Sequence, residues 1–257
     1  MMIYKYVRPE RLDVLENGMI RFTQASALND PFESYPCFGA LEHSLIQRQR
    51  ALIESFPASD TVKTAARLLI TPPVRKSLER FQDQLRAEIL ILSLTKKRNN
   101  LVMWSHYTDF HRGFVIGFDA DSDFFKAHQH KLITPLTEIK YSEHRPMLPE
   151  FDDFPNRTKE LANILIFSKS THWAYEEELR MVAHCESADH HVKADDGSDV
   201  YLFAYPKEAL REVVLGFATP DHVKEQVKML VKQRYEKAKV FQAQLSDAEF
   251  DLRIVPA

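Results

Sequence analysis

Three short segments of the sequence carry side chains that could do chemistry, and the first is acidic. It reads Asn29-Asp30-Pro31-Phe32-Glu33. Asn and Asp before a proline are common turn formers, and the residue before proline avoids the helical region. A turn is therefore the simplest interpretation. Glu33 makes the turn an acidic loop, and loops often hold functional sites.

The second segment spans residues 99–113 and places Trp104, His106, Tyr107 and His111 within eight positions. In a helix, Trp104, Tyr107 and His111 would share one face. Core packing explains the tryptophan well. The polar tips of the other rings must find partners wherever they are buried. We therefore treat His106, Tyr107 and His111 as candidate site residues, with core packing as the alternative.

The third segment runs from Trp173 to Arg180 and contains the pattern Glu176-Glu177-Glu178-Leu179-Arg180. In a strand, Glu176, Glu178 and Arg180 would point to one polar face, whereas Leu179 would point to the other. This places two carboxylates beside a guanidinium. An exposed strand face with salt bridges is the alternative interpretation. On either interpretation Glu178 is expected on a polar face, where Glu178→Gln would change stability by less than about 1 kcal/mol.

The composition excludes several other kinds of site. The formal charge of −3 argues against broad electrostatic binding of nucleic acid. Cys37 and Cys185 stand alone, so neither a disulfide framework nor a structural metal site is expected. None of the six glycines forms a phosphate-binding motif. No run approaches the roughly 20 apolar residues of a membrane helix, and no signal peptide opens the chain. We predict a cytoplasmic protein without a membrane partner.

The elements that must position these segments predict an α+β fold. Strand-like runs outnumber helical ones and do not alternate strictly with them, which favours a central mixed or antiparallel sheet, possibly split, with flanking helices. We predict one domain over residues 1–257, with a helical insertion at about 40–88 that is broken at Pro57 and at Pro72-Pro73. Helices are also expected at 101–110 and 220–237. The predicted strands are 3–6, 19–23, 89–94, 113–118, 138–142, 178–183, 200–204, 213–217, 240–245 and 250–255.

Taken together, the three segments resemble a bacterial family known as domain of unknown function 2971. The family pattern has an opening Tyr-Lys-Tyr, an Asn-Asp-Pro-Phe-Glu, a Met-Trp-x-His-Tyr with a following His-x-Gly, and a late Trp-x-x-Glu-x-Glu-x-Arg. These elements stand here at residues 4–6, 29–33, 103–107, 111–113 and 173–180. The resemblance extends from residue 3 to about residue 217. It implies the position of a site and no activity.

A more distant, fold-level similarity is to the ADP-ribosyltransferases. Those enzymes have a His, Arg or Tyr on the first strand, then a polar or aromatic residue, and late in the chain a Glu-x-Glu. Tyr4 or Tyr6, Thr23 and Glu176-x-Glu178 follow that order. The similarity implies that NAD is the nucleotide ligand and that a protein or nucleic acid accepts the ADP-ribose. No first-strand histidine and no clear Ser-Thr-Ser segment is present.

The chemistry implied by this similarity needs a carboxylate. Breaking the nicotinamide–ribose bond passes through an oxocarbenium-like state that a neighbouring glutamate stabilises. Glu178 would be that group, with Glu176 and His106 also catalytic. An aromatic ring such as that of Trp104 or Tyr107 could stack on the nicotinamide. The predicted ligand-binding residues are Tyr4, Tyr6, Asn29, Asp30, Trp104, Tyr107, His111, Trp173 and Arg180.

Two other functions stay open at this point. In a metal-dependent nuclease or phosphoesterase, Asp30, Glu33, Glu176 and Glu178 would hold Mg²⁺ through oxygen ligands. In a non-catalytic ligand-binding or sensor module, aromatic side chains would form a recognition pocket beside the carboxylates. All three functions require the separated segments to meet. We therefore predict that Asp30, His106, His111, Glu178 and Arg180 converge on one cleft.

Overall fold

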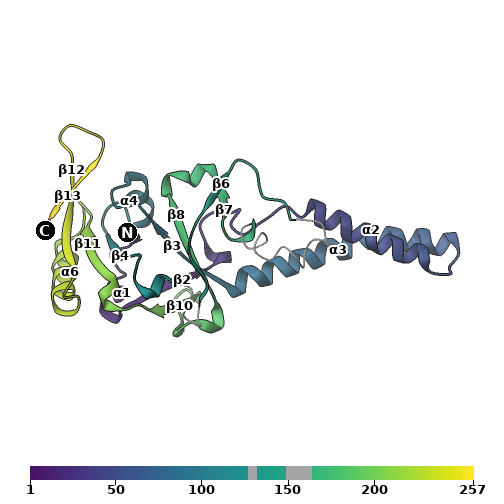
Figure 1. Cartoon of the computed structure of the whole chain (residues 1–257), viewed down its shortest axis with the longest axis horizontal. Helices are drawn as coiled ribbons and strands as arrows, with labels where there is room; N and C mark the ends of the chain where they lie inside the picture. The colour runs from purple at the N-terminus through teal and green to yellow at the C-terminus, as the bar shows by residue number, and fades with distance from the viewer. Residues whose placement is uncertain (127–131, 149–163) are drawn as a thin grey trace. The chain divides into compact units, whose positions relative to one another are not determined.

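The computed structural model describes residues 1–126, 132–148 and 164–257 (Figure 1). The chain divides into two compact units. The first consists of Met1–Thr23, Leu90–Ile139 and His172–Ala257, and the second of Gln24–Ile89 and Lys140–Thr171. The single domain expected from the sequence stays a prediction, because compactness alone does not decide whether a unit folds independently.

The first unit is built on a large sheet whose strands come from all parts of the chain. Its order is β13-β12-β11-β4-β1-β3-β2-β10-β9, and β8 pairs with both β3 and β5. The strands are β1 (Met2–Val7), β2 (Met19–Gln24), β3 (Ile89–Thr95), β4 (Phe114–Asp119), β5 (Leu132–Glu138), β8 (Glu178–His184), β9 (His190–Lys193), β10 (Asp199–Ala204), β11 (Leu210–Leu215), β12 (Lys239–Leu245) and β13 (Leu252–Pro256).

The sheet is mixed and mostly antiparallel, which confirms the predicted α+β class. Strand β4 pairs antiparallel with both β1 and β11, while β11 pairs parallel with β12. The helix α6 (Asp221–Arg234) connects these two parallel strands and buries an apolar stripe that includes Val223, Val227 and Val231. The remaining helices of this unit are α1 (Asp13–Asn17), α4 (Leu101–Tyr107) and the short 3-10 helices η2 (Asp123–Phe125), η4 (Thr171–Glu176), η5 (Cys185–Ser187) and η6 (Lys207–Ala209).

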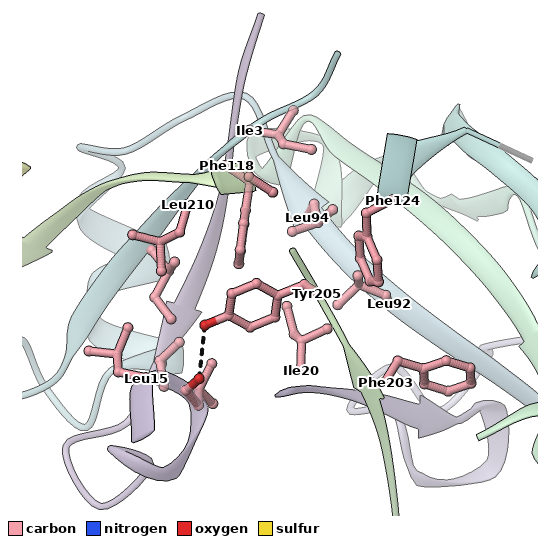
Figure 2. Packing of buried hydrophobic residues seen from close by; sticks show 14 of the residues in the cluster. Ile3, Leu15, Ile20, Leu92, Leu94, Phe118, Phe124, Phe203, Tyr205 and Leu210 are labelled. Carbon is pink, nitrogen blue, oxygen red and sulfur yellow. Dashed lines mark hydrogen bonds between the residues drawn. The ribbon is translucent and has the colours of Figure 1, made fainter. Parts of the chain in front are cut away.

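The main core lies on one face of the sheet, and Figure 2 shows part of it around Tyr205. Its buried tyrosines include Tyr205 and Tyr235. The Tyr205 hydroxyl donates to the carbonyl of Val14 at 2.8 Å, and the Tyr235 hydroxyl donates to that of Leu15 at 2.8 Å. These two carbonyls belong to α1, so the tyrosines fasten this short helix to the core. Both hydroxyls are satisfied, as burial of a phenol requires.

Strand β1 is covered on both faces, and its alternation assigns each side chain to one face. Ile3 and Val7 belong to the main core. Tyr4 and Tyr6 point the other way, into a smaller cluster with Trp104. By the same alternation Lys5 lies on the face of Ile3 and Val7. A lysine is thereby placed beside a hydrophobic core.

The second unit contains the helices expected between residues 40 and 88. These are α2 (Gly39–Ser55) and α3 (Asp60–Glu88), which lie side by side (Figure 1). The unit also holds η1 (Ala25–Ala27) and the parallel pair β6 (Lys140–Ser142) and β7 (Ser168–Ser170). The break predicted at Pro57 is confirmed, because it lies between α2 and α3.

The break predicted at Pro72-Pro73 is wrong, since α3 runs through both prolines. Proline fits the helical φ but removes a hydrogen-bond donor, which weakens the helix. Here tertiary packing compensates. Ile70, Val74 and Leu78 follow each other at four-residue spacing across the prolines, and all three are buried in one cluster with residues of α2.

Among the helices of the described residues, none combines the length and hydrophobicity needed to cross a membrane.

Candidate functional site

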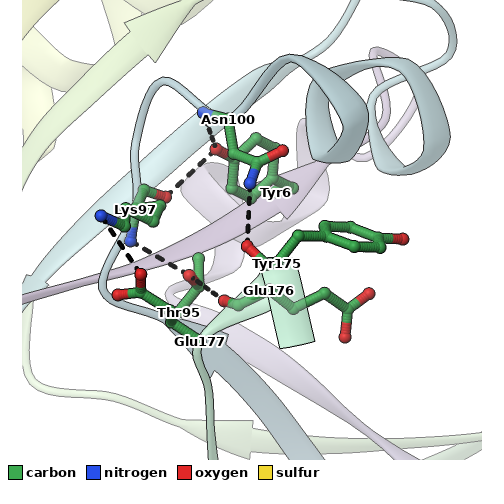
Figure 3. Close-up of polar contacts among 7 residues, drawn as sticks. All are labelled: Tyr6, Thr95, Lys97, Asn100, Tyr175, Glu176 and Glu177. Atoms are coloured by element: carbon green, nitrogen blue, oxygen red, sulfur yellow. Dashed lines mark hydrogen bonds and ion pairs between the residues drawn. The ribbon is translucent and has the colours of Figure 1, made fainter. Parts of the chain in front are cut away.

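Asn100 joins three segments at the beginning of α4 (Figure 3). Its side-chain oxygen caps the helix by accepting from the Met103 N–H at 3.1 Å. Its side-chain amide donates to the Tyr175 carbonyl at 2.8 Å, and its backbone N–H donates to the Tyr6 hydroxyl at 3.2 Å. Sequence reasoning missed this residue. The signal was available, because an Asn before an apolar helical run is a common N-cap.

Glu176 is buried, and it lies in a 3-10 helix and not on the strand that the sequence predicts. It ends η4, and its carbonyl accepts from the Thr95 hydroxyl at 2.5 Å (Figure 3). Its carboxylate accepts a hydrogen bond from the Tyr107 hydroxyl. The reason for the different path is Glu177, whose left-handed φ of 43° separates η4 from β8. Glu177 itself is exposed and pairs with Lys97 at 3.2 Å.

Glu178 and Arg180 form an ion pair on one face of β8, as the alternation predicts, but the pair is buried, so the alternative of an exposed strand face is wrong. The Arg180 Nε donates to Glu178 Oε1 at 2.7 Å and Nη2 donates to Oε2 at 3.2 Å. The two side chains are 3% and 1% exposed. Leu179, on the opposite face of β8, is buried as well. Strand β8 lies inside the sheet between β3 and β5, and its residues on both faces are buried except at His184.

Lys5 is the cation that the sequence analysis did not select. It is partly exposed, and its Nζ donates to the Ser93 carbonyl at 2.9 Å. Burial lowers the pKa of Lys5 to about 8, while the nearby carboxylates of Glu178 and Glu176 oppose that shift. Arg11 and Arg21 add repulsion in the same direction as burial. The charges of both candidate carboxylates thus act on Lys5. We call Lys5, Tyr107, Glu176, Glu178 and Arg180 the polar group of the site.

Aromatic side chains of α4 and η4 lie next to this group. The Tyr175 hydroxyl is 3.3 Å from His106 Nδ1, and the two rings meet edge to face at 6.4 Å. Trp173 and Tyr175 have ring centroids 6.2 Å apart. His106 is exposed, whereas Trp173 and Tyr175 are partly exposed. We call His106, Trp173 and Tyr175 the aromatic group. It offers rings to a ligand at the position where Tyr107 and Glu176 meet.

Trp104 and His111 belong to a different place. Trp104 is fully buried, its indole N–H donates to the Arg98 carbonyl at 2.9 Å, and its ring stacks with His111 at 6.1 Å. His111 also contacts Phe217, with centroids 4.7 Å apart, and burial lowers the pKa of His111. Within the described part of the chain, His111 Nδ1 has no hydrogen-bond partner. Trp104 is therefore a core residue, as the alternative of core packing predicts, and the His111 ring packs against the Trp104 ring.

The predicted helix over 101–110 ends early, at Tyr107. Asp109, Phe110 and His111 all take left-handed φ values of 50° to 66°. This path brings the His111 carbonyl oxygen so close to Gly216 that a Cβ there would lie 2.0 Å from it. Trp104, Tyr107 and His111 consequently do not share one helical face.

Tyr4 and Tyr6 line the second hydrophobic cluster, with their polar tips engaged. Burial raises the pKa of Tyr4 to about 12, and the neighbouring carboxylate of Glu212 adds to the rise. The Tyr6 hydroxyl donates to the Lys97 carbonyl at 3.1 Å and accepts from Asn100. Tyr6 thus supports the loop before α4.

Asn29, Asp30 and Glu33 lie in the second unit, where the expected turn is present. The Asp30 carboxylate accepts from the Phe32 N–H at 2.9 Å, and the Glu33 N–H donates to the Asp30 carbonyl at 3.0 Å. Asp30 and Glu33 are both buried. Across residues 1–126, 132–148 and 164–257, no group of three or more His, Cys, Asp or Glu side chains is placed to hold a metal ion.

Comparison with known proteins finds a family similarity over part of the chain. Residues 103–181 match the model of the family described as "Protein of unknown function (DUF2971)". This match confirms the resemblance to that family inferred from the motifs, and it includes most of α4 as well as the Glu176-to-Arg180 segment. No curated protein and no solved structure matches the chain.

Proposed function

We propose that the chain is an ADP-ribosyltransferase-like enzyme that binds NAD and breaks the bond between nicotinamide and ribose. The observation that carries the proposal is the contact between Tyr107 and Glu176. A buried carboxylate is held by a phenol hydroxyl directly beside the aromatic group. The carboxylate suits the ribose hydroxyls, and the rings suit the flat nicotinamide and adenine bases.

In the proposed reaction, Glu176 accepts a hydrogen bond from a hydroxyl of the nicotinamide ribose. The bond between the ribose C1′ and the nicotinamide nitrogen breaks, and its electron pair leaves with the nicotinamide. Positive charge develops on the ribose, and the negative Glu176 carboxylate stabilises it. A water or an acceptor nucleophile then bonds to C1′ and releases its proton to solvent. The products are nicotinamide and ADP-ribose, free or attached to the acceptor.

The geometry favours Glu176 over Glu178 for this role. Both oxygens of Glu178 are bound by the Arg180 guanidinium, in a bidentate pair that fixes the carboxylate. A carboxylate engaged in this way must break strong bonds before it can reach a ligand. We therefore assign Glu178 and Arg180 to positioning, because they begin the strand that follows Glu176.

The test is release of nicotinamide from NAD, followed by chromatography, for wild type and Glu176→Gln. Gln keeps the size of the side chain and an oxygen that can accept from Tyr107, so the fold should be retained. We expect release to fall about a hundredfold or more, the scale of losing one preorganised electrostatic group. Glu177→Gln is the matched control, because Glu177 is exposed and pairs with Lys97. Equal release by wild type and Glu176→Gln would refute the assignment.

A second candidate, a non-catalytic ligand-binding module, is favoured by one specific observation. Glu178 and Arg180 neutralise each other in a buried pair, as they would in a purely structural role. The aromatic group would then bind a ligand without turnover. Saturation-transfer NMR distinguishes the two functions. Binding of NAD to wild type with no nicotinamide formed would support the module.

A further inference from the structure

The turn between β12 and β13 forms an open groove with the beginning of α4. Figure 1 shows this turn extending beyond the paired part of the two strands. The groove has a volume of about 410 Å³. It is lined by Leu101, Leu245, Ser246, Asp247, Ala248, Glu249, Phe250 and Asp251.

Apolar side chains at the groove are unusually exposed. Phe250 is fully exposed and Leu245 is 60% exposed. The turn that presents them is closed by hydrogen bonds, because the Ser246 N–H donates to the Asp251 carbonyl at 3.1 Å and the Ser246 hydroxyl accepts from the Glu249 N–H at 3.3 Å. An aromatic ring that is exposed to water contributes little to the stability of the fold. Aromatic anchor residues are common where proteins bind partners.

The charge of the groove restricts the kind of partner. Asp247, Glu249 and Asp251 contribute three carboxylates. One nearby cation, Arg253, pairs with Asp247 at 3.5 Å, and the Asn99 amide donates to Asp251 at 3.3 Å. The excess negative charge attracts Lys and Arg side chains and repels the phosphates of a nucleic acid.

We propose that this groove binds a short basic segment of a partner protein. An aliphatic side chain of that segment packs against Phe250 and Leu245, and its Lys or Arg side chains face the three carboxylates. The proposal rests on the charge complementarity and the exposed apolar side chains.

A further step rests on the proposed function. Leu101, in the wall of the groove, directly follows Asn100, which is bonded to the Tyr175 carbonyl. The residue before Leu101 is thus hydrogen-bonded to the backbone of Tyr175, a member of the aromatic group. We infer that the bound basic segment is the acceptor of ADP-ribose, which favours a protein acceptor over a nucleic acid.

The experiment measures fluorescence anisotropy of a labelled twelve-residue peptide of alternating Lys and Leu, titrated with the full chain. A peptide with Glu in place of Lys is the control probe. We expect the Lys peptide to bind and the Glu peptide not to bind. Phe250→Ser and the double variant Asp247→Asn/Glu249→Gln should each weaken binding about tenfold or more, the size of effect expected at an anchor residue. Leu68→Ser, which changes an exposed apolar residue elsewhere, should leave binding unchanged.

Several results would overturn this proposal. They are no binding of the Lys peptide, equal binding of the Glu peptide, or equal binding by the Phe250→Ser variant. Self-association of wild type that Phe250→Ser abolishes would assign the groove to a second copy of the chain instead. Glu176→Gln should bind the peptide as wild type does. Peptide binding without nicotinamide release would therefore refute the proposed function and leave the groove proposal standing.

Discussion

Replacing Glu178 by Gln should cost far more stability than a surface substitution. The carboxylate pairs with Arg180 through two bonds, and neither side chain is more than 3% exposed. Removing the charge takes away a buried carboxylate that binds the guanidinium through two bonds. Breaking a buried pair in this way costs about 3–5 kcal/mol. For a chain of this size, such a loss lowers the melting temperature by roughly 6–20 °C.

The assay is thermal and urea unfolding of Glu178→Gln beside Glu177→Gln. Lys97 and Glu177 are 48% and 47% exposed, so loss of that pair should cost at most about 1 kcal/mol. The double variant Glu178→Gln/Arg180→Met should recover part of the loss, because it removes both charges. A Glu178→Gln protein within about 1 kcal/mol of wild type would refute the buried pair and restore the exposed face expected from the sequence.

Three further predictions follow from individual contacts. Between about pH 8 and 10.5 the unfolding free energy of wild type should rise relative to that of Lys5→Met. Burial lowers the folded pKa of Lys5 from 10.5 to about 8, so the unfolded chain binds more protons than the folded chain in this window. Urea titrations of both proteins at pH 7.5 and 9.5 measure the difference. Tyr107→Phe should lose about 1–3 kcal/mol in urea unfolding and lower nicotinamide release, because a donor to buried Glu176 is removed; unchanged values for both would contradict the contact. Gly216→Ala should lower the melting temperature, because its Cβ would lie 2.0 Å from the His111 carbonyl oxygen, whereas Gly39→Ala, with its nearest contact at 3.8 Å, should not.

The sequence was sufficient for the fold class because apolar runs and prolines act locally. The runs at 89–94 and 113–118 are observed as β3 (Ile89–Thr95) and β4 (Phe114–Asp119). The interruption at Pro57 separates two helices. At Pro72-Pro73 the same local rule failed, because packing around Val74 outweighs the missing hydrogen-bond donors.

The site was less predictable because burial depends on partners far away in sequence. Alternation assigns Glu178 and Arg180 to one face of a strand but cannot tell whether that face is covered. Strand β8 lies inside the sheet between β5 and β3, and β3 stands more than 80 residues earlier in the chain, so the surroundings of β8 come from distant segments. The turn after α4 likewise packs closely against Gly216, which no local pattern connects to His111. Lys5 is the middle residue of the opening Tyr-Lys-Tyr, yet the effect of Glu176 and Glu178 on its pKa is apparent only in the folded chain.

The central claim is that Glu176 acts on the nicotinamide ribose, and a crystal structure with a non-hydrolysable NAD analogue tests it most directly. The account predicts a ribose hydroxyl within about 2.6–3.2 Å of a Glu176 carboxylate oxygen, the range of a working hydrogen bond. It also predicts a base stacked on a ring of the aromatic group, with the Glu178–Arg180 pair intact. A dinucleotide bound away from Glu176, or contacting Glu178 in place of Arg180, would contradict the claim.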